Sequence, residues 1–276
     1  MQLASRFGNV CSIRTHVPLS DEQIRAVAPS IFAEGAHESR SARYTYIPTI
    51  EVLGALRKEG FKPFMACQTR VRNESKREHT KHMIRLRHAA QIDGAEAHEI
   101  ILLNSHDGTS SYQMLAGMFR FVCSNGLVCG HTMHDIRIRH NGDVVGDVIE
   151  GAFTVLDGFT AAEEQREKMQ LMTVNRGEQA AFARAALALK YEDIEPGLFP
   201  ISEAQVLMPR RFEDRRDDLW SVFNRAQENL TKGGLRARSA NGRVSTTRPL
   251  NSIDQNIKLN RALWILAEEM QRLKAA

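Results

Sequence analysis

The side chains best suited to chemistry in this sequence are basic ones, and they gather in two stretches. Residues 70–88 hold seven Lys and Arg residues against two Glu, and three His add latent positive charge. Residues 232–248 hold five Lys and Arg residues and no acid. Guanidinium and ammonium groups bind phosphate oxygens, so both stretches are candidate phosphate-binding surfaces. The candidate nucleic-acid-binding residues are Arg70, Arg72, Lys76, Arg77, Lys81, Arg85, Arg87, Lys232, Arg236, Arg238, Arg243 and Arg248.

The spacing of several arginines is that of one strand face. Alternate residues of a strand point to opposite sides, so Arg85 and Arg87 share one face while Ile84 and Leu86 share the other. The same spacing recurs in Arg70/Arg72 and Arg137/Arg139. We expect one apolar face and one face with a row of arginines that can follow a phosphate backbone. A merely solvated sheet face is the alternative for the strands, and a disordered connector is the alternative for residues 232–248.

Two other groups of residues have types found in active or metal sites. Cys123, Cys129, His131 and His134 are zinc-ligand types within 12 residues, but their spacing is not that of a zinc finger. A free cysteine in a core helix with loop histidines is the favoured interpretation, and metal binding is the alternative. The segment 106–109, His-Asp-Gly-Thr, could suggest acid–base chemistry, but Asp-Gly-Thr is typical of a turn.

The sequence contains none of the common catalytic motifs. It has no phosphate-binding loop of the GxxxxGK[ST] type, no GxGxxG after a strand, no HExxH and no GxSxG. No group of carboxylates resembles a nuclease metal site. We therefore expect a binding protein without a cofactor rather than an enzyme.

Composition places the chain among ordinary globular proteins. Its 276 residues are 42% apolar and 25% charged, which is not typical of a disordered chain. The net charge is +4 and the isoelectric point is about 9.0, a mild bias toward an anionic partner. We find no apolar run long enough to cross a membrane and no signal peptide, so we expect reduced cysteines and a cytoplasmic protein.

The first part of the chain predicts an α+β domain over residues 1–155. Capping signals predict helices over 21–33 and 49–59. Apolar and β-branched residues predict strands over 61–72, 81–90 and 98–104, and residues 110–122 are interpreted as a helix. These segments would form an antiparallel sheet with a β-β-β-α core packed by helices. A further hairpin, residues 136–140 and 143–149, is expected across Asn141-Gly142.

Residues 156–276 are expected to form a mainly helical region. Capping boxes predict helices over 160–189 and 252–274, and apolar spacing predicts one around 219–230. Trp220 and Trp264 lie on the apolar faces of these helices, which favours core packing over base stacking. Residues 231–250 are interpreted as a long basic loop between two helices.

Three long segments resemble one family in the same order. They are MLAGMFRFVCSNGLVCG (114–130), NRAQENLTKGGLRAR (224–238) and RPLNSIDQNIKLNRALWILAEEM (248–270). They resemble the phage/plasmid-like family of unknown function found on prophages, plasmids and integrative elements. The resemblance covers essentially the whole chain, and it implies a protein of a bacterial mobile genetic element.

The expected order of elements also resembles another superfamily. A helix, three antiparallel strands and a helix form the core of single-strand annealing proteins, the Rad-type and lambda Red beta class. That resemblance implies a ring or filament of identical subunits whose basic groove holds a single strand. The sequence after Gly126 lacks the helix typical of that superfamily.

Together these patterns lead to a hypothesis of single-stranded DNA binding or annealing in recombination. The partner would be single-stranded DNA, or RNA, and the protein would form a homo-oligomer without membrane association. The alternative is an interaction protein that inhibits a host defence system, because a basic patch also fits an acidic protein. A metal-dependent nuclease is a third hypothesis.

Overall fold

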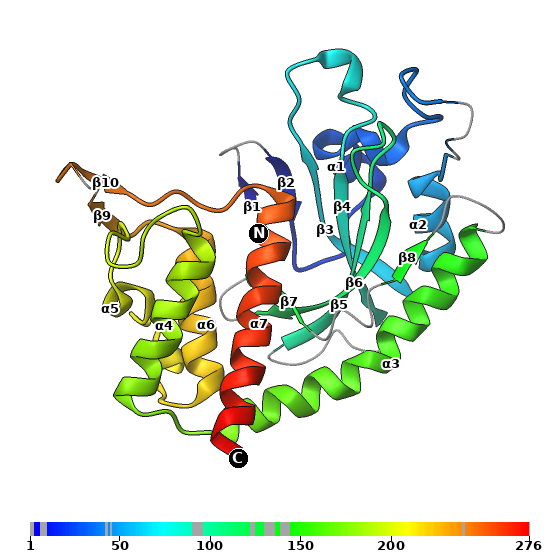
Figure 1. Cartoon of the computed structure of the whole chain (residues 1–276). Helices are drawn as coiled ribbons and strands as arrows, with labels where there is room; N and C mark the ends of the chain where they lie inside the picture. The colour runs from blue at the N-terminus through cyan, green and yellow to red at the C-terminus, as the bar shows by residue number, and fades with distance from the viewer. Residues whose placement is uncertain are drawn as a thin grey trace. The chain divides into compact units, whose positions relative to one another are not determined.

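The computed structural model describes the chain except residues 1–2, 6–9, 42–43, 45, 90–95, 122–124, 130–135, 139–143, 239–240 and 276. The chain divides into two compact units. Unit 1 comprises Met1–Thr160 and Asn251–Ile253, and unit 2 comprises Ala161–Leu250 and Asp254–Ala276. Unit 1 contains an antiparallel sheet with helices and unit 2 is mainly helical (Figure 1). The expected α+β class with a helical C-terminal half is confirmed.

A single antiparallel sheet organises unit 1. Its strands pair in the order β1-β2-β3-β4-β5-β6-β7, and β8 pairs with β6 at other residues than β7 does. The strands are β1 (Leu3–Ser5), β2 (Val10–Arg14), β3 (Phe61–Thr69), β4 (His82–His88), β5 (Glu96–Asn104), β6 (Tyr112–Arg120), β7 (Asn125–Val128) and β8 (Ile136–Ile138). The strands predicted over 61–72, 81–90 and 98–104 are thereby confirmed, with β3 ending at Thr69.

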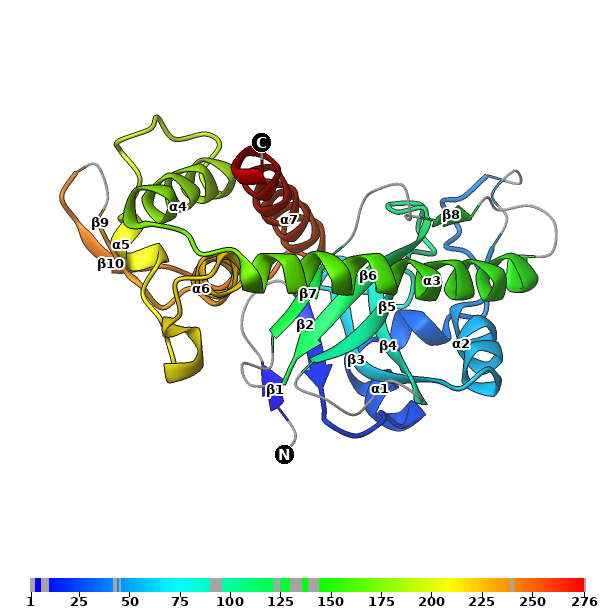
Figure 2. The same ribbon diagram turned by 90° about the horizontal axis from the view of Figure 1, so that it is seen from below.

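Helices cover one face of this sheet. They are α1 (Asp21–Val27), α2 (Thr49–Lys58) and the first part of α3 (Val144–Leu171), with a 3₁₀ turn at Pro29–Phe32. The capping box of Ser20 and Gln23 begins α1 as predicted, and α2 begins at Thr49. In Figure 2, α3 runs along the strands of unit 1, where Gly151 leaves room for the Met114 side chain of β6. A Cβ atom at position 151 would clash with that side chain.

Unit 2 is built around a helix that is buried on almost every side. This helix, α6 (Leu219–Lys232), carries the predicted apolar face, and Val222, Phe223 and Ala226 are fully buried. Trp220 stacks on Phe223 and meets Trp264 of α7 edge-on, so both tryptophans pack in the core as predicted. The other elements are the end of α3, α4 (Arg176–Lys190), α5 (Glu203–Val206), α7 (Ile253–Ala275), β9 (Arg236–Arg238) and β10 (Val244–Thr246).

The helix predicted over residues 110–122 is wrong. Residues Tyr112–Arg120 form β6, which pairs with β5 along its whole length. Met, Leu and Ala in this segment suit a helix, but tertiary pairing overrides local propensity. Gly117 lets β6 approach Ile101 of β5, because a Cβ there would lie 2.8 Å from that side chain. The expected β-β-β-α core is therefore a run of four strands.

Two further boundaries in the prediction are wrong. Residues 144–149 belong to α3 rather than to a hairpin, and Asn141-Gly142 lies outside the described residues. The Thr160–Glu163 signal lies inside α3, which continues to Leu171. A second helix, α4, begins instead at Arg176, because Asn175 and Glu178 form a capping box. The helix predicted over 252–274 is confirmed as α7.

No helix among the described residues is long and apolar enough to span a lipid bilayer.

A buried histidine links the sheet of unit 1 to its helices. His82 Nδ1 lies 3.1 Å from the carbonyl oxygen of Thr80 and 2.9 Å from Ser30 Oγ, and Nε2 lies 2.9 Å from Thr49 Oγ1. A carbonyl oxygen only accepts, so Nδ1 carries the proton and Nε2 accepts from the Thr49 hydroxyl. Burial, reinforced by the neighbouring His106, lowers the pKa of His82 to about 3. The neutral ring therefore ties the first turn of α2 to β4.

This histidine should make the protein sensitive to acid. An unfolded imidazole takes up its proton near pH 6.5, whereas the native His82 does so only near pH 3. The unfolded state therefore binds more protons between these values, and the stabilisation is complete above pH 6.5 and lost as the pH falls. We expect the free energy of unfolding to fall by at most about 1.4 kcal/mol per pH unit in this window. Urea unfolding of wild type and His82→Gln between about pH 7 and about pH 4 measures this fall.

The half-buried His88, at the end of β4, supplies a control. His88→Gln should retain the steep acid dependence of the wild type, and His82→Gln should flatten it. Parallel pH profiles for wild type and His82→Gln would show that this imidazole is not the group responsible.

Candidate nucleic-acid interface

The two strand arginines proposed as phosphate ligands do not face solvent. Arg85 and Arg87 are 2% and 0% exposed, and both pair with the buried carboxylate of Glu99. The predicted alternation of β4 is confirmed, since Ile84 and Leu86 lie on the opposite face, but the expectation of a solvated arginine face is wrong for this strand. An internal acid on the neighbouring strand β5 makes burial of these cations tolerable.

The other basic residues of the first stretch lie in the connection between β3 and β4. Because β3 ends at Thr69, Arg70 and Arg72 follow the strand and do not extend a strand face as expected. Arg70, Arg72 and Arg77 are exposed, and Arg77 lies 3.8 Å from Glu74. Lys76 and Lys81 are half-buried. Arg139 and the side chain of Arg137 lie outside the described residues.

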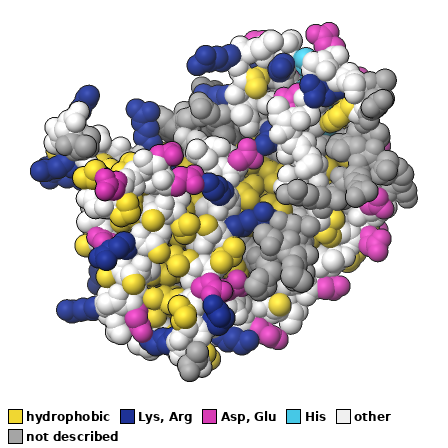
Figure 3. All heavy atoms as spheres, viewed as in Figure 1, with side chains coloured by type: hydrophobic (Ala, Val, Ile, Leu, Met, Phe, Trp, Pro, Cys, Tyr) yellow, Lys and Arg dark blue, Asp and Glu magenta, His cyan; other side chains and the backbone are white. Residues whose placement is uncertain are grey.

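The second basic stretch forms a β-hairpin rather than the expected plain loop. Strand β9 pairs with β10, with Arg238 opposite Val244 and Arg236 opposite Thr246. Ala237 is buried, and the alternation of strand residues brings Arg236 and Arg238 out on the exposed side. Lys and Arg side chains, dark blue in Figure 3, lie over this hairpin at the upper left.

Two glycines shape the base of the hairpin. Gly233 and Gly234 both have positive φ, +63° and +80°, a region that favours glycine. A Cβ at Gly233 would lie 2.7 Å from the carbonyl oxygen of Arg248, so the two ends of the segment come together there. The N–H of Gly234 donates to the Thr247 carbonyl at 2.9 Å, and the N–H of Thr247 donates to the Leu235 carbonyl at 2.8 Å.

A groove runs between this hairpin and the segment that joins α4 to α5. The N–H of Arg238 donates to the Pro200 carbonyl at 2.8 Å, and Gln205 Nε2 donates to the Arg236 carbonyl at 2.7 Å. These bonds hold the hairpin as one wall of a groove of about 640 Å³. Its lining includes Arg184 of α4, Phe199 and the two hairpin arginines.

The groove carries a local excess of positive charge. Three arginines, Arg184, Arg236 and Arg238, line it with one carboxylate, Glu203. Arg184 Nε lies 3.0 Å from Glu203 Oε1, and a hydrogen bond from its own backbone together with Arg184 holds the pKa of Glu203 below its ordinary value. Among the described residues, Arg236 and Arg238 have no carboxylate partner. They are therefore available to an anion.

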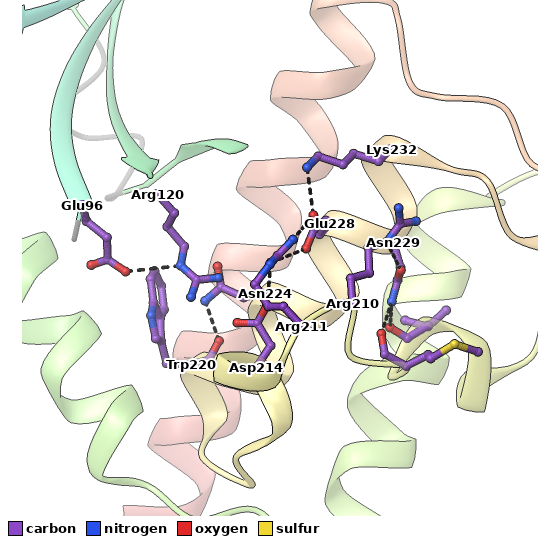
Figure 4. A network of polar contacts seen from close by, with 12 residues as sticks. Glu96, Arg120, Arg210, Arg211, Asp214, Trp220, Asn224, Glu228, Asn229 and Lys232 are labelled. Atoms are coloured by element: carbon purple, nitrogen blue, oxygen red, sulfur yellow. Dashed lines mark hydrogen bonds and ion pairs between the residues drawn. The ribbon is translucent and has the colours of Figure 1, made fainter. Parts of the chain in front are cut away.

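Lys232 belongs to a structural network rather than to this groove. Its Nζ lies 2.8 Å from Glu228 Oε1, and Arg211 binds the same carboxylate with two nitrogens at 2.6 and 2.7 Å (Figure 4). Arg211 also pairs with the buried Asp214 at 2.6 Å. Burial opposes ionisation of Glu228, but the hydrogen bonds from Arg211 and Lys232 lower its pKa overall. The network fixes the end of α6, from which the hairpin departs.

Arg243 and Arg248 are exposed; Arg243 directly precedes β10 in the chain and Arg248 follows it. Neither lines the groove, so the structure places both near the hairpin without assigning them a ligand.

The remaining candidates lead to no site in the described residues. Cys129 is buried, and Cys123, His131 and His134 lie outside the described residues. Within the described part of the chain, no three His, Cys, Asp or Glu side chains are arranged to hold a metal. Asp107 Oδ1 accepts bonds from the N–H and hydroxyl of Thr109 at 3.0 and 2.6 Å, which confirms the turn at this segment.

Sequence reasoning missed several residues of the groove. Arg184 is one of three cations on the amphipathic helix α4, and nothing in its neighbourhood distinguishes it from the other two. The segment Pro196–Pro200 is rich in Pro and Gly, which predicts a connection but not its role as a wall.

Comparison with known proteins identifies the family. Residues 36–264 match the family described as Domain of unknown function (DUF932). The chain belongs to this family. It is also similar to two Escherichia coli K12 proteins, UPF0380 protein YafZ and UPF0380 protein YfjQ. Each is 55% identical over 270 residues, which cover 98% of this chain and 97% of the relative. No solved structure matches the chain. The family match includes every residue that lines the groove.

The network at the end of α6 predicts that two neighbouring arginines contribute very differently to the free energy of unfolding. Arg211→Ala would leave two largely buried carboxylates without their main partner, and we expect a loss of about 3 kcal/mol in the free energy of unfolding. Arg215 is exposed at the end of the 3₁₀ turn Phe212–Arg215, which Arg211 directly precedes, and Arg215→Ala should change the free energy of unfolding by less than about 0.5 kcal/mol. Chemical denaturation measures both, and equal small effects would contradict the structural role of Arg211.

Proposed function

We propose that this protein binds nucleic acid, most concretely single-stranded DNA, through the groove beside the β9–β10 hairpin. The observation that carries the proposal is the convergence of Arg184, Arg236 and Arg238 on one groove that contains a single, already paired carboxylate. Two of these arginines come from the basic stretch that the sequence singled out. Arginine binds phosphate oxygens bidentately and is weakly hydrated, so it suits a phosphate backbone.

The remaining lining of the groove supports a strand with unstacked bases. Phe199 is half-buried in the lining and offers an aromatic face, and base–aromatic stacking is tolerant of sequence. The volume of about 640 Å³ falls within the usual range for sites that enclose a small molecule, so a nucleotide unit can enter. The arginines would bind phosphates of the strand and Phe199 would stack on one base. The strand would then be held in the groove while its other bases stay accessible to solvent.

Binding of a single strand in this way would promote strand annealing. Cations that neutralise two backbones reduce the repulsion between complementary strands, and base pairing then supplies the free energy. The resemblance to proteins of phages and plasmids supports the proposal of such a role in a mobile genetic element. A ring or filament of identical subunits would align several grooves, and particle shape with and without an oligonucleotide tests that assembly.

Binding to a labelled single-stranded oligonucleotide across a salt series tests the groove. The slope of log K against log salt is about −0.7 for each phosphate neutralised on a single strand. The double variant Arg236→Ala/Arg238→Ala removes two contacts, so we expect weaker binding and a slope shallower by about 1.4.

The control removes two positive charges from elsewhere in unit 2. Arg176 and Arg215 are exposed and do not line the groove, so Arg176→Ala/Arg215→Ala should bind almost as the wild type. Equal losses in the two double variants would mean that only net charge matters. Wild-type binding without salt dependence would reject the proposal. Duplex DNA and RNA of matched length, and mixing of complementary oligonucleotides, define the substrate and test annealing.

A second candidate is an inhibitor that docks on an acidic host defence protein. The apolar side chains of Leu198 and Val244 are 58% and 48% exposed beside the groove arginines, a mixture that also suits a protein surface. Copurification from host lysate, with and without nuclease, separates the two candidates. A stoichiometric host protein retained after nuclease treatment favours the inhibitor.

A further inference from the structure

Three arginines meet inside unit 1 on one face of the sheet. Arg14 ends β2, opposite Met65 of β3, and Met65 lies opposite Arg85 of β4. Directly opposed residues of an antiparallel sheet share a face, so Arg14, Arg85 and Arg87 point to the same side. Gly126 of β7 marks where two of them converge. A Cβ there would clash with Arg85 Nη1 and lie 2.9 Å from Arg14 Nη2.

One buried carboxylate faces these three cations. Glu99 Oε2 lies 2.9 Å from Arg85 Nη1, and Glu99 Oε1 lies 3.0 Å from both Nε and Nη2 of Arg87. Burial opposes ionisation of Glu99, but the three arginines together lower its pKa, so it is charged. Three guanidinium groups against one carboxylate leave two positive charges uncompensated within the described residues. A buried charge without a counter-charge is strongly unfavourable, so this excess calls for an anion.

The unused hydrogen-bond donors of the cluster point to the same conclusion. Arg14 Nη1, Arg85 Nε and Arg87 Nη1 are buried and have no hydrogen-bond partner in the described part of the chain. Aromatic rings make cation–π contacts with the guanidinium groups of Arg14 and Arg87, but no oxygen or nitrogen acceptor hydrogen-bonds to the three donors in the described part of the chain. The Arg87 Cζ atom lies 4.3 Å from the centre of the Phe64 ring and 4.2 Å from that of Phe119. Buried donors are satisfied in nearly all native proteins, so these three donors favour a ligand with several acceptor oxygens.

Arg14 is the member of the cluster nearest the surface, although its Nη1 atom is buried. This residue is half-buried, whereas Arg85 and Arg87 are buried completely. Next to it, the exposed His16 stacks on Phe121 with ring centres 6.1 Å apart, and the Arg14 Cζ atom lies 4.9 Å from the centre of the Phe119 ring. The Arg14 side is therefore the shortest route from solvent by which a ligand would reach the cluster.

We propose that Arg14, Arg85 and Arg87 form a binding site for a phosphate monoester or inorganic phosphate dianion. Two negative charges match the excess of the cluster, and phosphate oxygens accept paired bonds from guanidinium groups. Glu99 positions Arg85 and Arg87 and does not touch the ligand. The site lies in unit 1, is separate from the hairpin groove of unit 2, and does not rest on the proposed nucleic-acid binding.

Binding of inorganic phosphate to the full-length wild-type protein tests the site directly. We expect phosphate to broaden and shift its own ³¹P signal and to raise the melting temperature above that in chloride of equal ionic strength. Arg14→Gln removes the arginine nearest the surface, and we expect at least a roughly tenfold loss of phosphate affinity. Arg25→Gln is the matched control, because Arg25 is exposed and lies over the Phe32 ring outside the cluster.

Two further ligands test whether the bound phosphate belongs to a small metabolite or to the end of a nucleic-acid strand. A nucleoside 5′-monophosphate represents a small metabolite, and a 5′-phosphorylated oligonucleotide compared with its 5′-hydroxyl form represents a strand end. Preference for either phosphorylated ligand that is lost in Arg14→Gln supports the proposal and names the source. Arg236→Ala/Arg238→Ala should leave phosphate binding at this site unchanged, which separates it from the groove.

The proposal is overturned if the wild type shows no response to phosphate beyond that to chloride. It is also overturned if folded Arg14→Gln binds phosphate as tightly as Arg25→Gln does. The wild-type ³¹P measurement decides the matter even where Arg14→Gln fails to fold.

Discussion

The Glu99 carboxylate is the constraint on which the arrangement of unit 1 depends. It accepts hydrogen bonds from Arg85 and Arg87 on the neighbouring strand, and without it these two arginines would be buried with no acidic partner among the described residues. Removal of one partner from a buried ion pair is far more costly than loss of a surface pair. A shift of β4 by one residue relative to β5 would turn the arginines toward the helices and Ile84 and Leu86 away from them. The ion pair and the apolar core therefore specify the same register.

Strands β3, β4 and β5 and the helices α1, α2, α6 and α7 follow from local signals, but the role of the arginines does not. Period-two alternation is visible in the sequence, and β4 obeys it. Whether the polar face of a strand meets water or protein depends on which residues pack against it. The acid that pairs with the buried Arg85 lies 14 residues further along the chain. Arginine spacing alone thus predicts a shared face and not its exposure.

The errors of boundary and element type have related causes. Tyr112–Arg120 contains Met, Leu and Ala, which suit helix and buried strand alike, so its pairing with β5 decided the outcome. The short strands β9 and β10 lack an alternating apolar pattern, because β10 is exposed throughout. Gly233 and Gly234, which have positive φ, shape the base of this hairpin. The groove also requires Arg184, which lies on a helix and precedes Arg236 by more than 50 residues. No local sequence pattern predicts that these two residues line the same groove.

The closure of the chain at Gly233 and Arg248 has a consequence for how a ligand would be captured. The stem of the hairpin is fixed to the Pro200 carbonyl and to Gln205 before any ligand arrives. The backbone entropy of ordering this segment is therefore lost during folding and not during association. Capture would resemble docking on a rigid template, with a rate governed by diffusion and long-range attraction and not by coupled folding.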